Sequence, residues 1–229
     1  DGIRDYKVTG VQTCALPISL LNAQNDNGQT PLHLVKSWSM AELLLQHGAK
    51  ANAQDYQGRS PLLCRCIQGE RNKEPLDMVE WLEYGLNFGM DPWLKDKDGQ
   101  SVFDVFMKHR KFGALHSLIS ACIAKDKQTV FKKDQNGNTL LHKLCNCNLS
   151  QENQSFCLLL QEGADTNASN EDGDTPLHIL CRKINRLSPR REKNHRKYIS
   201  LLREYGANYN LKNKSNFSVL KLVYLNKKI

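Results

Sequence analysis

The segment NDNGQTPLHLV, at residues 25–35, is the most informative part of the sequence because variants of it return along the chain. The variants are DYQGRSPLLCR at 55–65, DKDGQSVFDVF at 96–106, DQNGNTLLHKL at 134–144, EDGDTPLHIL at 171–180 and a degenerate NKSNFSVLKL at 213–222. A second mark is a glycine after an apolar segment, which precedes the next turn position by ten residues in four places: Gly48 to Gly58, Gly89 to Gly99, Gly163 to Gly173 and Gly206 to Asn216. Two marks held at a constant separation indicate one structural unit that is used several times.

The chemistry of this unit predicts two helices and a projecting finger. A glycine after the second helix can take the left-handed conformation that ends it, and a second glycine allows the tight turn of the finger. A hydroxyl residue able to cap the first helix recurs at Thr30, Ser60, Ser101, Thr139, Thr175 and Ser218. Proline follows at the first helical position in Pro31, Pro61 and Pro176, where no amide hydrogen is missed.

The unit resembles the ankyrin repeat, whose signature is a turn glycine followed by Thr-Pro-Leu-His. The resemblance covers residues 20–229 and implies an all-α solenoid of stacked helix pairs with short β-hairpin fingers. The repeats are expected at 25–54, 55–95, 96–133, 134–169 and 170–212, with a partial sixth at 213–229. The third unit fits the pattern least well, because Lys127 stands where a glycine is expected and SVFD at 101–104 replaces TPLH.

The two ends of the chain differ from the repeats. Residues 1–19 resemble the in-frame translation of a sequencing-library index primer, so we treat them as non-native, expect them to be disordered and exclude them from the fold. Residues 20–24 look like the tail of a preceding finger, and the last unit stops after its first helix. A stacked array needs polar terminal repeats, so we expect a fragment of a longer protein.

The composition favours a protein that works inside the cell as a monomeric domain. The chain has 229 residues, 40% of them hydrophobic, and a net charge of +8. It has no apolar run of eighteen residues, so we expect no membrane insertion. Without residues 1–19 it keeps seven cysteines, an odd number that indicates reduced thiols in a cytoplasmic or nuclear setting.

The residues that could suggest chemistry have structural explanations. His33, His142 and His178 occupy the fourth position of TPLH, from which the imidazole can bond to a neighbouring loop. Cys66, Cys145 and Cys181 each lie eight residues beyond a turn glycine, where a small buried residue is expected rather than a zinc ligand. No catalytic or phosphate-binding motif is present, so we expect no enzyme activity, no cofactor and no metal.

The resemblance implies recognition of another protein through the finger tips and the first helices. The candidate contacts are Asp26, Asn27, Trp38, Tyr56, Gln57, Lys97, Asp98, Gln135, Asn136, Glu171 and Asp172. Trp81 and Trp93 are better explained by packing. A basic insertion adds a further candidate surface, formed by Arg182, Lys183, Arg186, Arg190, Arg191, Lys193, Arg196 and Lys197.

Three functions remain open at this point. The first is an interaction module or scaffold. The second is the non-catalytic ankyrin segment of a larger enzyme, such as a ubiquitin ligase, a kinase or a helicase-like protein. The third is electrostatic binding of nucleic acid or of an anionic surface through residues 182–197, although the segment has little of the aromatic content that single-strand binding uses. A solvated loop, or a nuclear-import signal, would explain the same basic residues.

Overall fold

A computed structural model describes residues 18–72, 76–147, 153–183 and 189–221. Most of the adapter-like segment and the basic residue Arg186 therefore lie outside the described residues; Ile18 and Ser19, at the end of that segment, begin the first helix. The helices are α1 (Ile18–Leu21), α2 (Pro31–Leu34), α3 (Trp38–Gln46), α4 (Pro61–Asn72), α5 (Leu76–Asn87), α6 (Val102–Lys108), α7 (Phe112–Asp126), α8 (Gln128–Phe131), α9 (Leu140–Asn146), α10 (Gln154–Gln161), α11 (Pro176–Lys183) and α12 (Pro189–Glu204).

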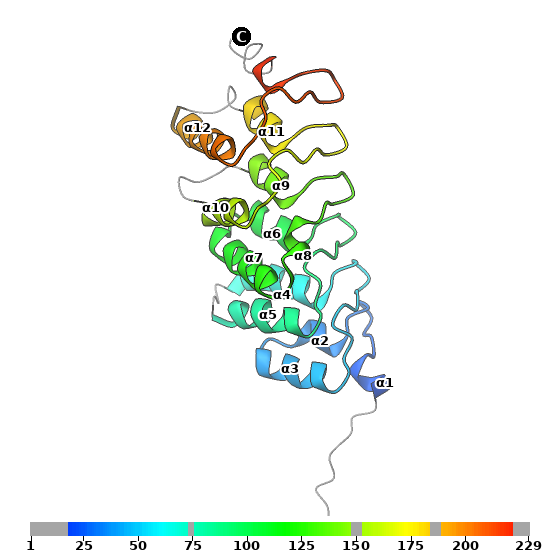
Figure 1. Cartoon of the computed structure of the whole chain (residues 1–229). Coiled ribbons are helices and arrows are strands. Elements are labelled where there is room, and N and C mark those ends of the chain that lie inside the picture. Colours follow the sequence, from blue (N-terminus) through cyan, green and yellow to red (C-terminus); the bar gives the residue numbers. More distant parts are fainter. Residues whose placement is uncertain (1–17, 73–75, 148–152, 184–188, 222–229) are drawn as a thin grey trace, which may run out of the picture.

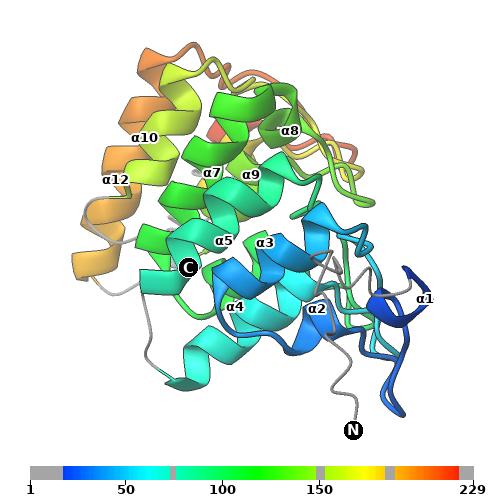
Figure 2. The same cartoon turned by 90° about the horizontal axis from the view of Figure 1, so that it is seen from below.

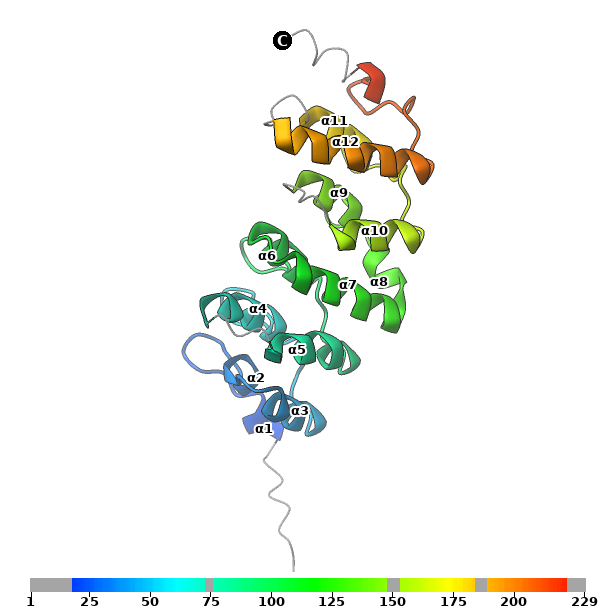
Figure 3. The same cartoon turned by 90° about the vertical axis from the view of Figure 1, so that its left-hand side faces the viewer.

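The helices are stacked in single file from α1 at one end to α12 at the other, which confirms the solenoid (Figure 3). The inner helices α2, α4, α6, α9 and α11 lie next to the fingers, which project together along one side (Figure 1). The outer helices α3, α5, α7, α10 and α12 form a second layer that fans out along the stack (Figure 2). None of the described helices is both long enough and apolar enough to cross a membrane.

The inner helices begin directly after the hydroxyl residues that the sequence predicts as their caps. Ser101 lies in extended backbone before α6, and its hydroxyl accepts a hydrogen bond from the Asp104 amide at 3.4 Å. Thr139 and Thr175 accept equivalent bonds from the amides of His142 and His178. Each bond satisfies an amide that the helix itself leaves unpaired, so the start of each helix is defined by local chemistry.

The predicted left-handed glycines are present at both marks of the repeat. Gly163 ends α10 with φ 85°, and Gly173 turns the fifth finger with φ 75°. In the third unit Lys127 has ordinary helical backbone instead, and the chain runs on into the short helix α8. The second helix of the third unit thus forms without this glycine, and the ten-residue spacing from Lys127 to Gly137 is kept.

Each finger is a tight turn held by its own first side chain. The Asp55 carboxylate accepts hydrogen bonds from the amides of Gln57 and Arg59, both at 2.9 Å. Asn25, Asp134 and Asn170 make the same pair of bonds in their fingers. In the described residues only Lys212 and Ser218 form a β-bridge, so the fingers are hairpin-shaped turns without regular strands.

The core runs through the stack, with apolar contributions from every helix pair. Cys66, Cys145 and Cys181 are buried in it at successive levels, as small apolar residues would be. Burial raises the pKa of the Cys181 thiol to about 12, so this thiol is protonated and unreactive at neutral pH.

Candidate protein-binding surface

The finger tips are exposed pairs of turn residues, and most of them are linked tip to tip. Asp26, Asn27, Tyr56, Gln57, Lys97, Asp98, Gln135, Asn136, Glu171 and Asp172 are all exposed. The Tyr56 amide donates to the Asn27 carbonyl at 3.0 Å, and the Lys97 amide donates to the Gln57 carbonyl at 2.9 Å. Because the backbone bonds fix neighbouring fingers to each other, their side chains form a row with a set spacing.

Tyr56 is the most prominent apolar side chain on this row, with 57% of its surface exposed. Its ring lies so close to Gly28 of the first finger that a Cβ atom built there would approach Tyr56 Cδ1 to 2.5 Å. The Tyr56 ring can occupy this position because Gly28 has no side chain. An exposed tyrosine with a fixed ring is the kind of residue that contributes strongly to protein interfaces.

A hollow of about 380 Å³ lies between the second and third fingers and the inner helices α4 and α6. We call it the finger groove, and it is lined by Gln57, Arg59, Ile67, Asp96, Asp98, Gln100, Val105, Lys108 and His109. The structure thus brings the predicted contacts Gln57 and Asp98 to one hollow. The remaining predicted finger contacts lie outside its lining, on the tips along the row.

The finger groove carries opposite charges on its two sides. Asp96 and Asp98 come from the third finger, whereas Lys108 is at the end of α6. Arg59 pairs with the buried Asp55 at 2.7 Å. Burial opposes ionisation of Asp55, but the bonds from Arg59 and the backbone amides outweigh it and lower the pKa of the carboxyl. Within the described chain Asp98 and Lys108 form no ion pair, so both can meet charges of a ligand.

The histidines of TPLH connect one repeat to the next, as predicted. The Thr30 amide donates to His33 Nδ1 at 3.1 Å, so Nδ1 is an acceptor and the ring proton is on Nε2, which donates to the Arg59 carbonyl at 3.0 Å. His142 and His178 bond in the same way to the carbonyls of Asp174 and Phe217. Burial lowers the pKa of His33 and of His142, which keeps these rings neutral.

The third and fourth repeats are joined differently, by a lysine that the sequence analysis did not single out. Asp104 replaces the histidine, and Lys143 Nζ of α9 contacts Asp104 Oδ1 at 2.6 Å and Asp134 Oδ2 at 3.1 Å. The Lys143 ammonium also lies 5.9 Å from the centre of the Trp93 ring. No backbone bond links the third finger to the fourth among the described residues.

The structure corrects the assignment of Trp38 to the binding surface. Trp38 is only 6% exposed. Its ring packs edge-on against Trp81 at 5.6 Å between centroids and stacks on Tyr84 at 5.9 Å. Trp38 is therefore a core residue that joins the first two repeats, and its indole cannot reach a partner. Trp81 is fully buried, and Trp93, which is half-buried, packs on Phe103. Both tryptophans therefore have the packing role that the sequence predicts.

The basic insertion is largely helical, because α12 begins at Pro189. Arg182 is paired with Asp174 at 2.6 Å, Arg196 with Glu192 at 2.6 Å, and the Lys183 ammonium donates to the Asn146 carbonyl. Lys193 and Lys197 are exposed, and Arg190 and Arg191 belong to the first turn of α12. Arg182 and Arg196 thus have acidic partners within the chain, which reduces the net charge available to a polyanion.

Comparisons with known proteins agree with the fold and the finger geometry. The ankyrin repeat family model matches residues 27–56 and 172–214. Its two matches fall on regular parts of the array and leave out the irregular third unit. The chain thus contains ankyrin repeats, and ankyrin repeats are protein–protein interaction modules.

The chain is similar to parts of much longer proteins. It is 28% identical over 176 residues to the nuclear factor NF-kappa-B p105 subunit of Gallus gallus, covering 71% of this chain and 16% of that protein. It is 26% identical over 156 residues to Rabankyrin-5 of Mus musculus, covering 67% of this chain and 12% of that protein. The crystal structure of the ankyrin repeat domain of Bcl-3 superposes with a TM-score of 0.65 at 23% identity, over 88% of this chain and 81% of that one.

Proposed function

We propose that this chain is a protein-binding module or scaffold that holds a partner protein in the finger groove and carries out no catalysis itself. The observation that carries the proposal is the hollow itself, in which residues of two fingers and two inner helices meet. Its size suits an extended segment or a few side chains of a folded partner. Tyr56 lies outside the lining of the groove, with its ring against Gly28 of the first finger, and would supply an apolar anchor beside the groove.

The charges of the finger groove suggest how a partner is oriented. A ligand segment with a cation facing Asp98 and an anion facing Lys108 would match both sides of the groove. Such complementarity contributes more to specificity and association rate than to affinity. The affinity would come mainly from burial of apolar surface around Tyr56.

We also propose a cytosolic or nuclear setting. The seven cysteines of the described residues all carry free thiols, as expected for a reducing compartment.

The experiment compares two tyrosine variants of similar exposure. Proteins retained from a cell lysate by the wild-type chain are identified by mass spectrometry, and each candidate is then purified and titrated calorimetrically. We expect Tyr56→Ala to weaken binding at least tenfold, which corresponds to about 1.4 kcal/mol.

The control is Tyr205→Ala, because Tyr205 is 44% exposed but lies beyond α12, far along the stack. Circular dichroism checks that both variants keep their helices. A partner that binds the two variants equally well would contradict a binding surface formed by Tyr56 and the neighbouring finger groove.

A further inference from the structure

In regular parts of the array an asparagine ties each stem to the next, where a stem is the segment between an outer helix and its finger. Asn52 Nδ2 donates to the Gly89 carbonyl at 2.8 Å, and Asn52 Oδ1 accepts from the Asp91 amide at 2.8 Å. Asn167 binds Gly206 and Asn208 in the same way, at 2.9 and 2.8 Å. The carboxamide thus satisfies one carbonyl and one amide of the following stem.

Phe131 stands at this position in the fourth stem, four residues after Lys127 just as Asn167 is four residues after Gly163. A phenyl ring can form neither bond. Among the described residues no side chain bonds the Gly163 carbonyl or the Asp165 amide, which are the groups the missing asparagine would have satisfied. The fifth stem therefore presents an unused acceptor and an unused donor.

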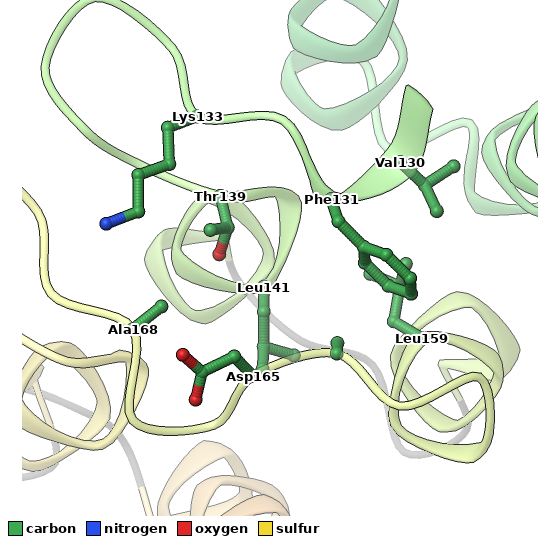
Figure 4. A pocket seen from close by; sticks show the side chains of 9 residues that line it. Val130, Phe131, Lys133, Thr139, Leu141, Leu159, Asp165 and Ala168 are labelled. Atoms are coloured by element: carbon green, nitrogen blue, oxygen red, sulfur yellow. The ribbon is translucent and has the colours of Figure 1, made fainter. Parts of the chain in front are cut away.

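A pocket opens beside these groups, between the fourth and fifth stems (Figure 4). We call it the stem pocket. Its volume is about 140 Å³, and its apolar lining comes from Val130, Phe131, Leu141, Leu159, Ala164 and Ala168. In Figure 4 the Phe131 ring lies beside Leu159, while Lys133 and Asp165 stand on the other side. Lys133 is already bonded to the Ser169 carbonyl at 2.8 Å, so it ties the two stems together without filling the pocket.

The size and the polar groups together define the ligand. An apolar cavity of about 150 Å³ is large enough to hold benzene, so the stem pocket suits one aliphatic side chain and is too small for a lipid chain. A residue in extended backbone offers its N–H and its C=O along one edge, and in a parallel strand pair these two groups bond to the C=O and the N–H of two residues that flank a third. These two groups match the Gly163 carbonyl and the Asp165 amide.

We propose that the stem pocket binds one leucine- or methionine-sized side chain of an extended partner peptide, whose backbone pairs with Gly163 and Asp165. This site is separate from the finger groove. It would give a partner a second point of attachment on the stems of the same array.

The test is an NMR titration of the methyl-labelled chain with the blocked peptide acetyl-Ala-Leu-Ala-amide. We expect saturable shifts of the Leu141 and Leu159 methyl groups and of the Asp165 amide, in the millimolar range. The matched peptide acetyl-Ala-Gly-Ala-amide keeps the backbone and lacks the apolar side chain, so it should bind at least tenfold more weakly. Equal shifts with both peptides would overturn the proposal.

Two variants block the site by different routes, one at its backbone groups and one in its apolar space. Phe131→Asn restores the regular asparagine, and Ala168→Leu fills the space from the fifth stem. Each should reduce binding of the leucine peptide at least tenfold, and unchanged binding in the folded Ala168→Leu variant would refute the site.

Tyr56→Ala should leave the shifts unchanged, which separates this proposal from that of the finger groove. Shifts that depend on protein concentration in the absence of peptide would instead indicate a second copy of the chain as the occupant and overturn the peptide proposal.

Discussion

The junction between the fifth and sixth repeats and the junction between the third and fourth solve the same problem in different ways. The former uses mainly neutral bonds: the Lys214 amide to the Asp172 carbonyl, His178 to Phe217, and, between the stems that lead into the fifth and sixth fingers, Asn167 to Gly206. The Asn213 carboxamide also donates to the buried Asp174 carboxylate at 2.8 Å. The latter relies on Lys143 between two carboxylates. Between the stems that lead into the third and fourth fingers, the Trp93 indole donates to the Thr129 carbonyl at 2.8 Å.

The two junctions show how a stacked array accommodates an irregular unit. Neutral bonds distributed over finger, helix and stem make a junction in which each link contributes modestly. At the third unit the finger link is absent and the histidine is replaced, so one charged side chain takes over much of the connection. A junction of this kind depends more on one residue than the regular junctions do, and substitutions should show this.

The largest effect is expected from Lys143→Met. The lysine side chain is only 12% exposed, and its removal leaves Asp104 and Asp134 without their cation. Breaking a buried ion pair in this way costs roughly 3 kcal/mol. The free energy of unfolding, measured by urea denaturation, should fall by about that amount.

The control for this variant is an exposed pair. Arg196 and Glu192 are 66% and 37% exposed, and Arg196→Met should cost less than about 0.5 kcal/mol. If both methionine variants lose the same small amount, the third junction does not depend on Lys143.

A matched pair of glycines tests the missing finger link. Gly99 and Gly173 have nearly the same backbone, with φ 72° and 75°. A Cβ atom at Gly173 would lie 2.8 Å from the Lys214 amide nitrogen, whereas a Cβ atom at Gly99 would meet nothing within 4 Å. We expect Gly99→Ala to cost about 1 kcal/mol from left-handed backbone alone. Gly173→Ala should cost about 1 kcal/mol more, because it also disturbs the finger bond. Equal losses in urea denaturation would mean that the third and fourth fingers are in contact.

The regular parts of the array were predictable because their chemistry is local. The cap hydroxyls, the helix-ending glycines and the bridging histidines act within a few residues or at a constant repeat distance. The burial of Trp38 could not be read in this way, since its partners Trp81 and Tyr84 come from the next repeat across a connection of variable length.

The irregular junctions were only partly visible in the sequence. The missing glycine at Lys127 and the change from histidine to Asp104 were noted, but Lys143 links acids of two different units and carries no motif. The position four residues after each helix-ending residue gives a usable signal: it is Asn52, Trp93, Phe131, Asn167 and Asn210 in successive stems. Aligning the units on that position would have identified the two stems that lack the asparagine.

The smallest effect concerns pH, and it distinguishes histidine-bridged junctions from the lysine-bridged one. Burial lowers the pKa of His33 and His142 below the usual 6.5, so the unfolded chain binds more protons than the folded chain in mildly acidic solution. Their stabilising contribution is complete above about pH 6.5 and decreases as the pH falls below that value toward the lowered pKa. The urea midpoint should therefore decrease from pH 7.5 to pH 5. Asp55 and Asp134, whose carboxyl pKa values are lowered, take up protons only below this pH range.

The control is the double variant His33→Leu/His142→Leu. Leucine already occupies the equivalent place in the second repeat, where Leu63 is fully buried. The double variant should lose about 1 kcal/mol per histidine at pH 7.5 and depend less on pH than the wild type does. An undiminished pH dependence in this variant would show that other groups are responsible for it.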